Sequence, residues 1–341
     1  STIMEGNGRE QLKMWENVQG HEQNKHFLQQ LLLAGKRTPS LLFLGPSGIG
    51  KKTLAAAFAK DFLCRSENLP CSGCPSCHAF NAKGHPDFLL VEQSAPGKEI
   101  VIDQIKEVAR QAVFAPNLSE HKVCIIDAAD YMNATAANSL LKLLEEPPRF
   151  WLFILIANTA ARLLPTIRSR VIQLRFDALP AEIIEAVLKK EGAQTDEAVT
   201  LAHLADGSIG SALNMLKSNT MDCRNRALTV LEQMPTKRPL QLTAQYSWPE
   251  KTTGENGLTL LEMMLFILRD ALLCKEGMTS NAYNIDVLPR IEKCFADWHS
   301  AKIKNIIKIV QESYMAIASN ASGKVVWEAM LVRMNMILKE D

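Results

Sequence analysis

The chain has 341 residues, more than one compact hydrophobic core usually holds, so two or three domains are expected. Hydrophobic residues make up 47% and charged residues 22% of the sequence, which argues against a disordered chain. The 38 Lys and Arg against 37 Asp and Glu leave a net charge of +1, so a protein whose main task is gripping nucleic-acid phosphates is disfavoured.

No apolar run in the sequence reaches the length of a membrane span. The longest candidates, residues 150–157 and 258–274, are too short or are interrupted by charged side chains. The first five residues contain no apolar core after a basic start, so we expect no secretory signal. Together these patterns predict a cytoplasmic protein without a membrane partner.

The first half of the chain alternates between two hydrophobic patterns. Short continuous apolar runs predict buried strands, and apolar side chains at helical spacing predict amphipathic helices. The expected strands are residues 41–44, 87–91, 123–126, 151–156 and 171–174, and the expected helices are residues 24–33, 52–63, 102–113 and 134–145. Strands that alternate with helices indicate a parallel sheet covered on both faces, so we expect an α/β domain over residues 1–176.

Beyond residue 176 the strand pattern stops and only helical periodicity continues. Residues 180–217 predict short helices around a turn, and we expect a small helical domain at 177–218. Pro, Gly and Thr favour a loop at 235–257. A third, all-helical domain is expected at 222–341, with helices at 224–233, 258–274, 301–319 and 324–339.

A glycine-rich segment joins the first predicted strand to the helix that follows it. Its sequence, GPSGIGKKT, places Gly45, Gly48, Gly50, Lys51 and Thr53 in the arrangement of a phosphate-binding loop. Glycines let backbone N–H groups turn toward phosphates at a helix N-terminus, and the lysine meets the β- and γ-phosphates. The alternative is a chance glycine-rich turn, which the strand-to-helix context disfavours.

Two parts of a working ATPase site are missing from this sequence. The position after the lysine requires Ser or Thr, whose hydroxyl binds Mg²⁺, but it is Lys52, and Thr53 lies about 100° further round the helix. Asp127 ends an apolar strand, where a carboxylate orients the metal, yet Ala128 follows in place of a residue that polarises water. We therefore expect a degenerate nucleotide site that does not bind ATP productively.

Four of the eight cysteines crowd into one short segment, whereas the others are scattered. In a cytosolic chain such a cluster is more often a metal site than a disulfide framework. Four thiolates suit tetrahedral zinc, and because no ligand position stays open the site would be structural. An iron–sulfur cluster is the alternative. The expected ligands are Cys64, Cys71, Cys74 and Cys77.

Several sequence blocks accompany the phosphate loop and the cysteines in a characteristic order. They are WENVQG at 15–20, HPD at 85–87, IDQI at 102–105, ANSLLKLLEEPP at 137–148, LLPTIRSR at 163–170 and GSIGSAL at 207–213. In these blocks the chain resembles the AAA+ clamp-loader family, and within it the delta-prime type of the bacterial DNA polymerase III complex. The blocks are dense between residues 15 and 176, whereas the last third is similar only in being helical.

The resemblance assigns roles to three further residues. Gly210 stands where ATPase subunits of the family carry a second-sensor arginine, which is a third loss from the site. Asn158 matches the first-sensor position, although a strand-end turn residue is an equal alternative. Arg170 corresponds to the arginine of the family's Ser-Arg-Cys motif, which reaches into a neighbouring subunit's ATP site and stabilises the transferring phosphate. Without the resemblance, Arg168 and Arg170 would be interpreted as solvated surface charges.

The fold implied by the resemblance is an AAA+ P-loop domain with an inserted zinc module, a helical lid and a C-terminal collar. The implied function is that of a non-catalytic clamp-loader subunit with structural zinc and without bound ATP. Its implied partners are gamma/tau-type and delta-type subunits in a hetero-pentameric ring and, through the complex, the sliding clamp and primed DNA. The alternatives are an active ATPase subunit of the same complex and a zinc-dependent DNA-binding module, which the near-neutral charge disfavours. For residues 222–341, the pattern supports an internal helical core as well as it supports an oligomerisation collar.

Overall fold

The computed structural model describes residues 14–34, 39–66, 68–71, 73–95, 97–218, 220–249 and 257–339. The chain divides into two compact units, Ser1–Leu179 and Pro180–Asp341. Within the second unit, the separation of a lid at 177–218 from a collar at 222–341 stays a prediction. None of the helices in the described ranges is both long and apolar enough to cross a membrane.

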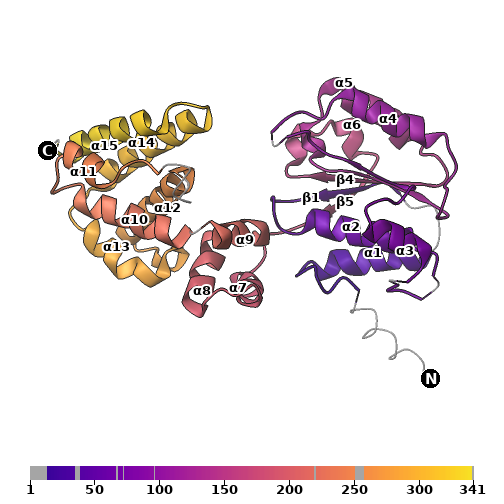
Figure 1. The fold of residues 1–341 in the computed structure, drawn as a ribbon, viewed down its shortest axis with the longest axis horizontal. Helices are drawn as coiled ribbons and strands as arrows, with labels where there is room; N and C mark the ends of the chain where they lie inside the picture. The colour runs from indigo at the N-terminus through magenta and orange to yellow at the C-terminus, as the bar shows by residue number, and fades with distance from the viewer. Residues whose placement is uncertain are drawn as a thin grey trace, which may run out of the picture. The chain divides into compact units, whose positions relative to one another are not determined.

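The first unit is built on a five-stranded parallel sheet (Figure 1). Every residue of the central strand β4 and of its neighbour β3 is buried, which explains their largely apolar sequences. The predicted parallel α/β fold is confirmed. In spatial order the strands are β2 (Phe88–Val91), β3 (Lys122–Ile126), β4 (Trp151–Ala157), β1 (Leu41–Leu44) and β5 (Ile172–Arg175).

Helices cover both faces of this sheet. In Figure 1, α1 (Glu22–Ala34), α2 (Lys51–Phe62) and α3 (Pro75–Asn81) lie on one side, and α4 (Ile102–Ala112), α5 (Ala134–Glu145) and α6 (Pro165–Arg168) lie on the other.

The strand side chains alternate between two hydrophobic cores, one on each face. On β4, Leu152 and Ile154 belong to the core that includes α1 and α2, whereas Phe153 and Leu155 belong to the core that includes α4 and α5. Because successive residues of a strand point to opposite faces, a single strand contributes to both cores.

The carboxyl ends of the strands meet at one edge of the sheet. Leu44, the last residue of β1, is in register with Ala157 of β4 and Arg175 of β5. Val91, the last residue of β2, is in register with Ile126 of β3. The segments that follow these strands therefore emerge at the same edge, which is where open α/β sheets bind ligands.

The second unit is entirely helical in its described residues. Its long helix α12 lies at the centre, because it packs against α10, α13 and α14 and buries apolar side chains along most of its length. The predicted helical C-terminal region is confirmed. The helices are α7 (Ala181–Lys190), α8 (Thr195–Leu204), α9 (Ile209–Lys217), α10 (Thr220–Gln233), α11 (Pro239–Gln245), α12 (Gly257–Lys275), α13 (Leu288–Cys294), α14 (Ser300–Ala318) and α15 (Gly323–Lys339).

The loop predicted at 235–257 contains a helix, α11, so the prediction is wrong for that part. Pro239 stands in the first turn of α11, where its missing N–H interrupts no helical hydrogen bond. The side-chain oxygen of Gln241 accepts a hydrogen bond from the Arg238 N–H at 3.0 Å and closes the start of the helix. Residues 250–256 of the predicted loop lie outside the described part of the chain.

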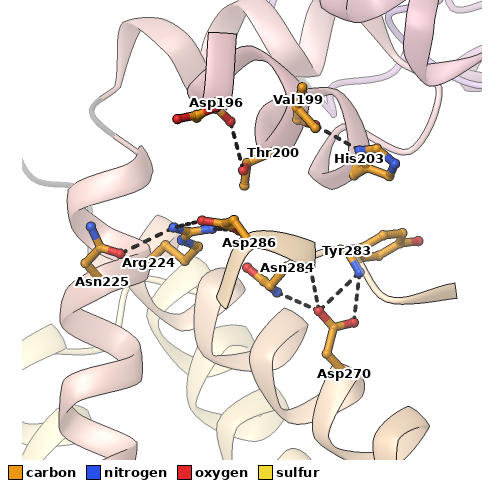
Figure 2. A network of polar contacts seen from close by, with 10 residues as sticks. All are labelled: Asp196, Val199, Thr200, His203, Arg224, Asn225, Asp270, Tyr283, Asn284 and Asp286. Carbon is orange, nitrogen blue, oxygen red and sulfur yellow. Dashed lines mark hydrogen bonds and ion pairs between the residues drawn. The ribbon is translucent and has the colours of Figure 1, made fainter. Parts of the chain in front are cut away.

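A buried carboxylate organises the segment that precedes α13 (Figure 2). Asp270, on α12, is fully buried and accepts hydrogen bonds from the backbone N–H groups of Tyr283 and Asn284 at 2.8–3.1 Å. The Asn284 side chain donates a further bond to it at 2.7 Å. One charged side chain thus fixes the path of this segment over α12.

An ion pair ties the same segment to α10 (Figure 2). Both terminal nitrogens of Arg224, on α10, donate to the carboxylate of Asp286, at 2.7 and 2.8 Å. Burial raises the pKa of Asp286, but the Arg224 guanidinium lowers it below its usual value. The pair therefore joins α10 to the segment that precedes α13 within the second unit.

Candidate functional site

The glycine-rich loop follows β1 and leads directly into α2. Gly45 donates its N–H to the Ala157 carbonyl at 3.2 Å, and a Cβ at this position would lie 2.1 Å from the Phe176 carbonyl oxygen. Gly48 and Gly50 have φ values of 74° and 99°, the left-handed region that favours glycine. The loop therefore has the backbone of a phosphate cradle at a helix N-terminus.

The side chain of Lys51 folds back onto this loop. Its ammonium donates to the carbonyls of Gly45 and Pro46, both at 2.5 Å, and to Asn158 Oδ1 at 3.1 Å. Burial lowers the pKa of Lys51 to about 8, although the nearby carboxylate of Asp127 opposes this shift. The structure thus brings Asn158, from the end of β4, to the lysine of the loop.

Lys52 lies between two carboxylates at the same edge of the sheet. Its ammonium is 2.6 Å from Glu92 Oε2 and 2.9 Å from Asp127 Oδ2. Burial alone would lower the pKa of Lys52, but the two carboxylates raise it above its usual value. The carboxylate expected to orient a metal is therefore already paired with a cation, whereas Thr53 is exposed on the next position of α2.

The segment after β3 contains no side chain that could polarise a water molecule at the expected position. Ala128 has a left-handed backbone with φ of 57°, and its N–H donates to Asp127 Oδ1 at 3.0 Å. Asp130 is buried and accepts the N–H groups of Asn158 and Thr159 at 3.2 and 3.4 Å. Asp130 thus supports the end of β4 and the Asn158 side chain that follows it.

The four clustered cysteines come together in the segment that follows α2 and in the first turn of α3. Their Sγ atoms all lie within 4.8 Å of one another, and those of Cys64 and Cys74 are 3.7 Å apart. A tetrahedral site with Zn–S bonds of about 2.3 Å places its sulfur atoms about 3.8 Å apart, so the donor set fits that geometry. Burial raises the pKa of Cys64 to about 11 and that of Cys77 further still. At Cys74, burial is outweighed by N–H groups of Cys77 and Arg65, which lower the pKa to about 6 and favour the thiolate at that position. The sulfur atoms of all four residues form a cluster able to hold a metal ion: Cys64, Cys71, Cys74 and Cys77.

A polar network joins the cysteine segment to the sheet. The hydroxyls of Ser76 and Ser119 both donate to the Leu63 carbonyl at 2.6 Å, and both lie within 3.2 Å of His85 Nε2. Burial lowers the pKa of His85, so the neutral imidazole is favoured. Asp87 accepts N–H bonds from the loop before β3, at 2.7–2.8 Å. The HPD block is therefore the structural link between the cysteine cluster and the sheet.

Arg170 lies just beyond α6, on the surface of the first unit. Its Nη2 is 2.8 Å from Glu145 Oε1, and its Nη1 donates to the Thr166 carbonyl at 3.0 Å and to the Ser169 hydroxyl at 3.2 Å. The Arg168 side chain, two residues earlier, makes a long contact of 3.5 Å with the Ala160 carbonyl and no ion pair within the described part of the chain. Of these two arginines, Arg170 is therefore the one held in a defined position.

Two family models match the chain, and together they cover most of it. The model described as "DNA polymerase III, delta subunit" matches residues 20–180, and the model described as "DNA polymerase III, delta subunit, C terminal" matches residues 218–335. The DNA polymerase III subunit delta' of Bacillus subtilis is 30% identical over 288 residues, which cover 82% of this chain and 86% of that protein. The chain belongs to the delta-prime family of DNA polymerase III subunits.

A second delta-prime relative matches a shorter part. The DNA polymerase III subunit delta' of Pseudomonas aeruginosa is 31% identical over 224 residues, which cover 65% of this chain and 64% of that protein, just under two thirds of its length. Among solved structures, a DNA polymerase III gamma subunit-related protein of Thermotoga maritima has a TM-score of 0.48 at 16% identity, covering 92% of this chain and 99% of that one.

Most of the predicted nucleotide-site residues of this delta-prime family member lie together. The three loop glycines, Lys51 and Asn158 form one site, and Asp127 adjoins it through its ion pair with Lys52. Gly210 lies in α9, in the second unit. The roles of these residues stay predictions.

Three acidic residues of this delta-prime family member are parts of the site that sequence reasoning missed. Glu92 directly follows β2, and an acid at a strand end was a usable signal, but its contact with Lys52 depends on β2 lying beside β3. Asp130 lies three residues after Asp127, but its bonds to the segment after β4 come from tertiary structure, which no local pattern indicates. Glu145 belongs to the LLEEPP block, yet nothing local in that block indicates an arginine partner.

Proposed function

We propose that this delta-prime family member is a non-catalytic subunit of a clamp loader, the ATP-driven complex that opens a sliding clamp and places it on primed DNA. The family assignment supports membership of the complex. The geometry around the phosphate loop supports the absence of ATP turnover by this subunit. The first unit would be an AAA+ domain with a zinc module, and the protein would act in the cytoplasm.

The observation that carries the proposal is the position of Lys52. In a working site, a hydroxyl at this position and a carboxylate after the next strand hold Mg²⁺. Here the Lys52 ammonium contacts Asp127 and Glu92 at 2.9 and 2.6 Å, so an incoming divalent ion would have to displace it and would find no hydroxyl there. Ala128 and Gly210 remove two further groups, because neither side chain can orient water or reach a phosphate.

Calorimetric titration of the full chain with MgATP tests this proposal. The wild-type chain should bind weakly or not at all, whereas Lys52→Thr, which restores the hydroxyl and removes the ammonium, should bind at least about tenfold more tightly. Lys52→Ala is the matched control, because it removes the ammonium without supplying a metal ligand, and its gain should be smaller. Micromolar, magnesium-dependent binding with phosphate release by the wild-type chain would instead establish the alternative, an active ATPase subunit.

The retained function would lie in Arg170, acting as an arginine finger at the ATP site of a neighbouring subunit. A finger supplied in trans commonly contributes about 10³–10⁵ in rate, because the guanidinium stabilises charge that develops on the transferring phosphate. Arg170 is partly exposed on the surface of the first unit, so a neighbouring subunit could reach it.

Arg170→Ala should lower the rate of ATP hydrolysis of the reconstituted complex, measured with clamp and primed DNA present. The loss should equal the contribution of the one ATP site that Arg170 completes. Arg170→Lys should recover little, because a point charge does not reproduce the planar guanidinium. The control Arg168→Ala should be much milder. Wild-type hydrolysis and clamp loading by Arg170→Ala would leave only a scaffold role.

The partners in this proposal are gamma/tau-type and delta-type subunits in a hetero-pentameric ring, with the clamp and DNA reached through the complex. The helical residues 222–341 would form the collar of that ring. Val325, Val332 and Met336 are exposed on α15 at spacings of seven and four residues, which places them on one face of the helix. Such an apolar face on the outside of the unit supports helix-to-helix assembly.

The metal in the cysteine cluster is proposed to be zinc in a structural role. Four thiolates close the coordination shell and leave no position for water or substrate. The network of Ser76, His85 and Ser119 would connect the zinc-bound segment to the sheet.

A further inference from the structure

Arg170 and Glu145 form an ion pair between two segments of the first unit that lie far apart in sequence. Glu145 is the last residue of α5, and Arg170 lies two residues beyond the end of α6, which packs against α5. The pair joins Arg170 Nη2 to Glu145 Oε1 at 2.8 Å, while Nη1 donates to Thr166 and Ser169. Both terminal nitrogens, the donors that a finger presents to a phosphate, are therefore engaged within the chain.

The end of α5 determines where Glu145 lies. The N–H of Glu146 bonds to the Lys142 carbonyl at 3.3 Å as the helix ends, and Pro147, which follows, cannot continue it. The last carbonyl groups of a helix carry partial negative charge, which adds to the attraction between this helix end and a guanidinium. Arg170 thus lies against the negative end of α5.

The ion pair between Arg170 and Glu145 is exposed and therefore weak, so a more highly charged anion can replace Glu145 as the partner of Arg170. The side chains of Arg170 and Glu145 are 35% and 48% exposed, and exposed pairs contribute only about 0.2–1 kcal/mol. A triphosphate carries more negative charge than one carboxylate and accepts both arginine nitrogens. A carboxylate that stayed 2.8 Å from the guanidinium would offset the charge that a finger supplies, so the two partners of Arg170 compete.

We propose that Glu145 is the resting partner of Arg170 and withholds it from the neighbouring ATP site until the subunits close around clamp and DNA. This inference rests on the proposed function, because Arg170 meets a nucleotide only within a ring. A pair of about 0.2–1 kcal/mol lowers the engaged fraction of Arg170 in the unstimulated complex by about 1.4- to 5-fold. In the stimulated complex the phosphate has already displaced Glu145.

Glu145→Gln in the reconstituted complex tests the inference, because it keeps the side-chain shape and removes the charge. ATP hydrolysis is measured without clamp and DNA and then with both. The unstimulated rate should rise about 1.4- to 5-fold and the stimulated rate should equal that of wild type. Glu145→Asp, which keeps the charge on a shorter side chain, should give an intermediate rise. The matched control is Glu146→Gln, since Glu146 is exposed and makes no ion pair among the described residues, and it should change neither rate.

Combination with Arg170→Ala separates this inference from the proposed function. If Arg170→Ala alone changes neither rate, the arginine finger itself is wrong. If Arg170→Ala slows hydrolysis while Glu145→Gln matches wild type or lowers both rates, the finger stands and the resting partner is refuted. A rise that persists in the double variant also refutes it, because the effect would not then act through Arg170.

Discussion

Replacing Asp286 with Ala removes the partner of an almost completely buried guanidinium. Arg224 is 3% exposed, and both of its bonds to Asp286 are charge-assisted. Breaking a fully buried ion pair costs about 3–5 kcal/mol, because the remaining charge stays desolvated. Asp286 itself is 37% exposed, so water can enter its place and hydrate part of the guanidinium. We therefore expect the opening free energy of this part of the second unit to fall by about 2–3 kcal/mol.

The control is Glu232→Ala, which breaks another two-bond arginine pair in the same unit. Arg290 donates to both carboxylate oxygens of Glu232 at 2.5 Å, but this arginine is 44% exposed. Water replaces the lost carboxylate there, so the expected loss is below about 1 kcal/mol. The difference between the two variants measures the effect of burial.

Hydrogen exchange of the full chain, resolved by peptide, measures this loss without assuming that a two-unit protein unfolds in one step. In Asp286→Ala, protected amides of residues 281–287 should exchange about 30- to 150-fold faster, and β4 should be unaffected. Equal protection in wild type and Asp286→Ala, or a loss no larger than that of Glu232→Ala, would refute the reasoning.

The same pair has a defined pH dependence. Burial raises the pKa of Asp286, but Arg224 holds it below its usual value. A carboxyl with a lowered pKa stabilises the folded state above its unfolded pKa of about 3.9, and this contribution is lost as the pH falls through the folded-state value. The difference in opening free energy between wild type and Asp286→Ala should therefore vanish in acid.

Metal analysis of the purified protein should find about one zinc per chain, and Cys77→Ser should lose it while β4 keeps its protection against hydrogen exchange. A metal-free wild-type protein with four freely titratable thiols in this segment would contradict that expectation. Val332→Glu should leave the melting temperature nearly unchanged, because the side chain is exposed on α15, but it should prevent co-purification with the other subunits. Val113→Glu, at an exposed position of the first unit, is its control and should still co-purify; equal recovery of both variants would argue against a collar at α15.

The inner strands of the sheet were predictable because they are buried on both faces. All residues of β4 are buried, so its sequence is a continuous apolar run that no surface helix would carry. The long helices were predictable from their apolar spacing for the related reason that each covers a core. Continuous apolar runs and helical apolar spacing can both be recognised in a short stretch of sequence.

Four short helices were not predicted, and they share a physical cause. Each of α3, α6, α11 and α13 carries a proline in its first turn. The same residue that ends a helix elsewhere in a chain is well accommodated at the start of one. Such segments are too short to display a hydrophobic period, so proline was their strongest local signal. Proline favours the interpretation of a segment as a loop, which is wrong when it stands in the first turn of a helix.

The residue types of the candidate site followed from its motifs, whereas their partners did not. The ion pair of Lys52 with Glu92 requires β2 to lie beside β3. The order of strands in a sheet cannot be predicted from local sequence patterns. The contact of Arg170 with Glu145 likewise depends on the packing of α6 against α5. Sequence motifs therefore indicated which groups are missing from the site, and the fold showed what replaces them.

The Lys52 ammonium is a counter-ion tethered to the chain. A diffusing cation must compete with the Lys52 ammonium for Asp127 and Glu92. Because a four-carbon side chain attaches this ammonium to the backbone, its effective concentration does not fall on dilution. Chelators that strip magnesium from solution cannot remove this cation. Charge balance at this edge of the sheet therefore does not depend on a bound divalent ion, and the local structure should be the same whether magnesium is abundant or absent.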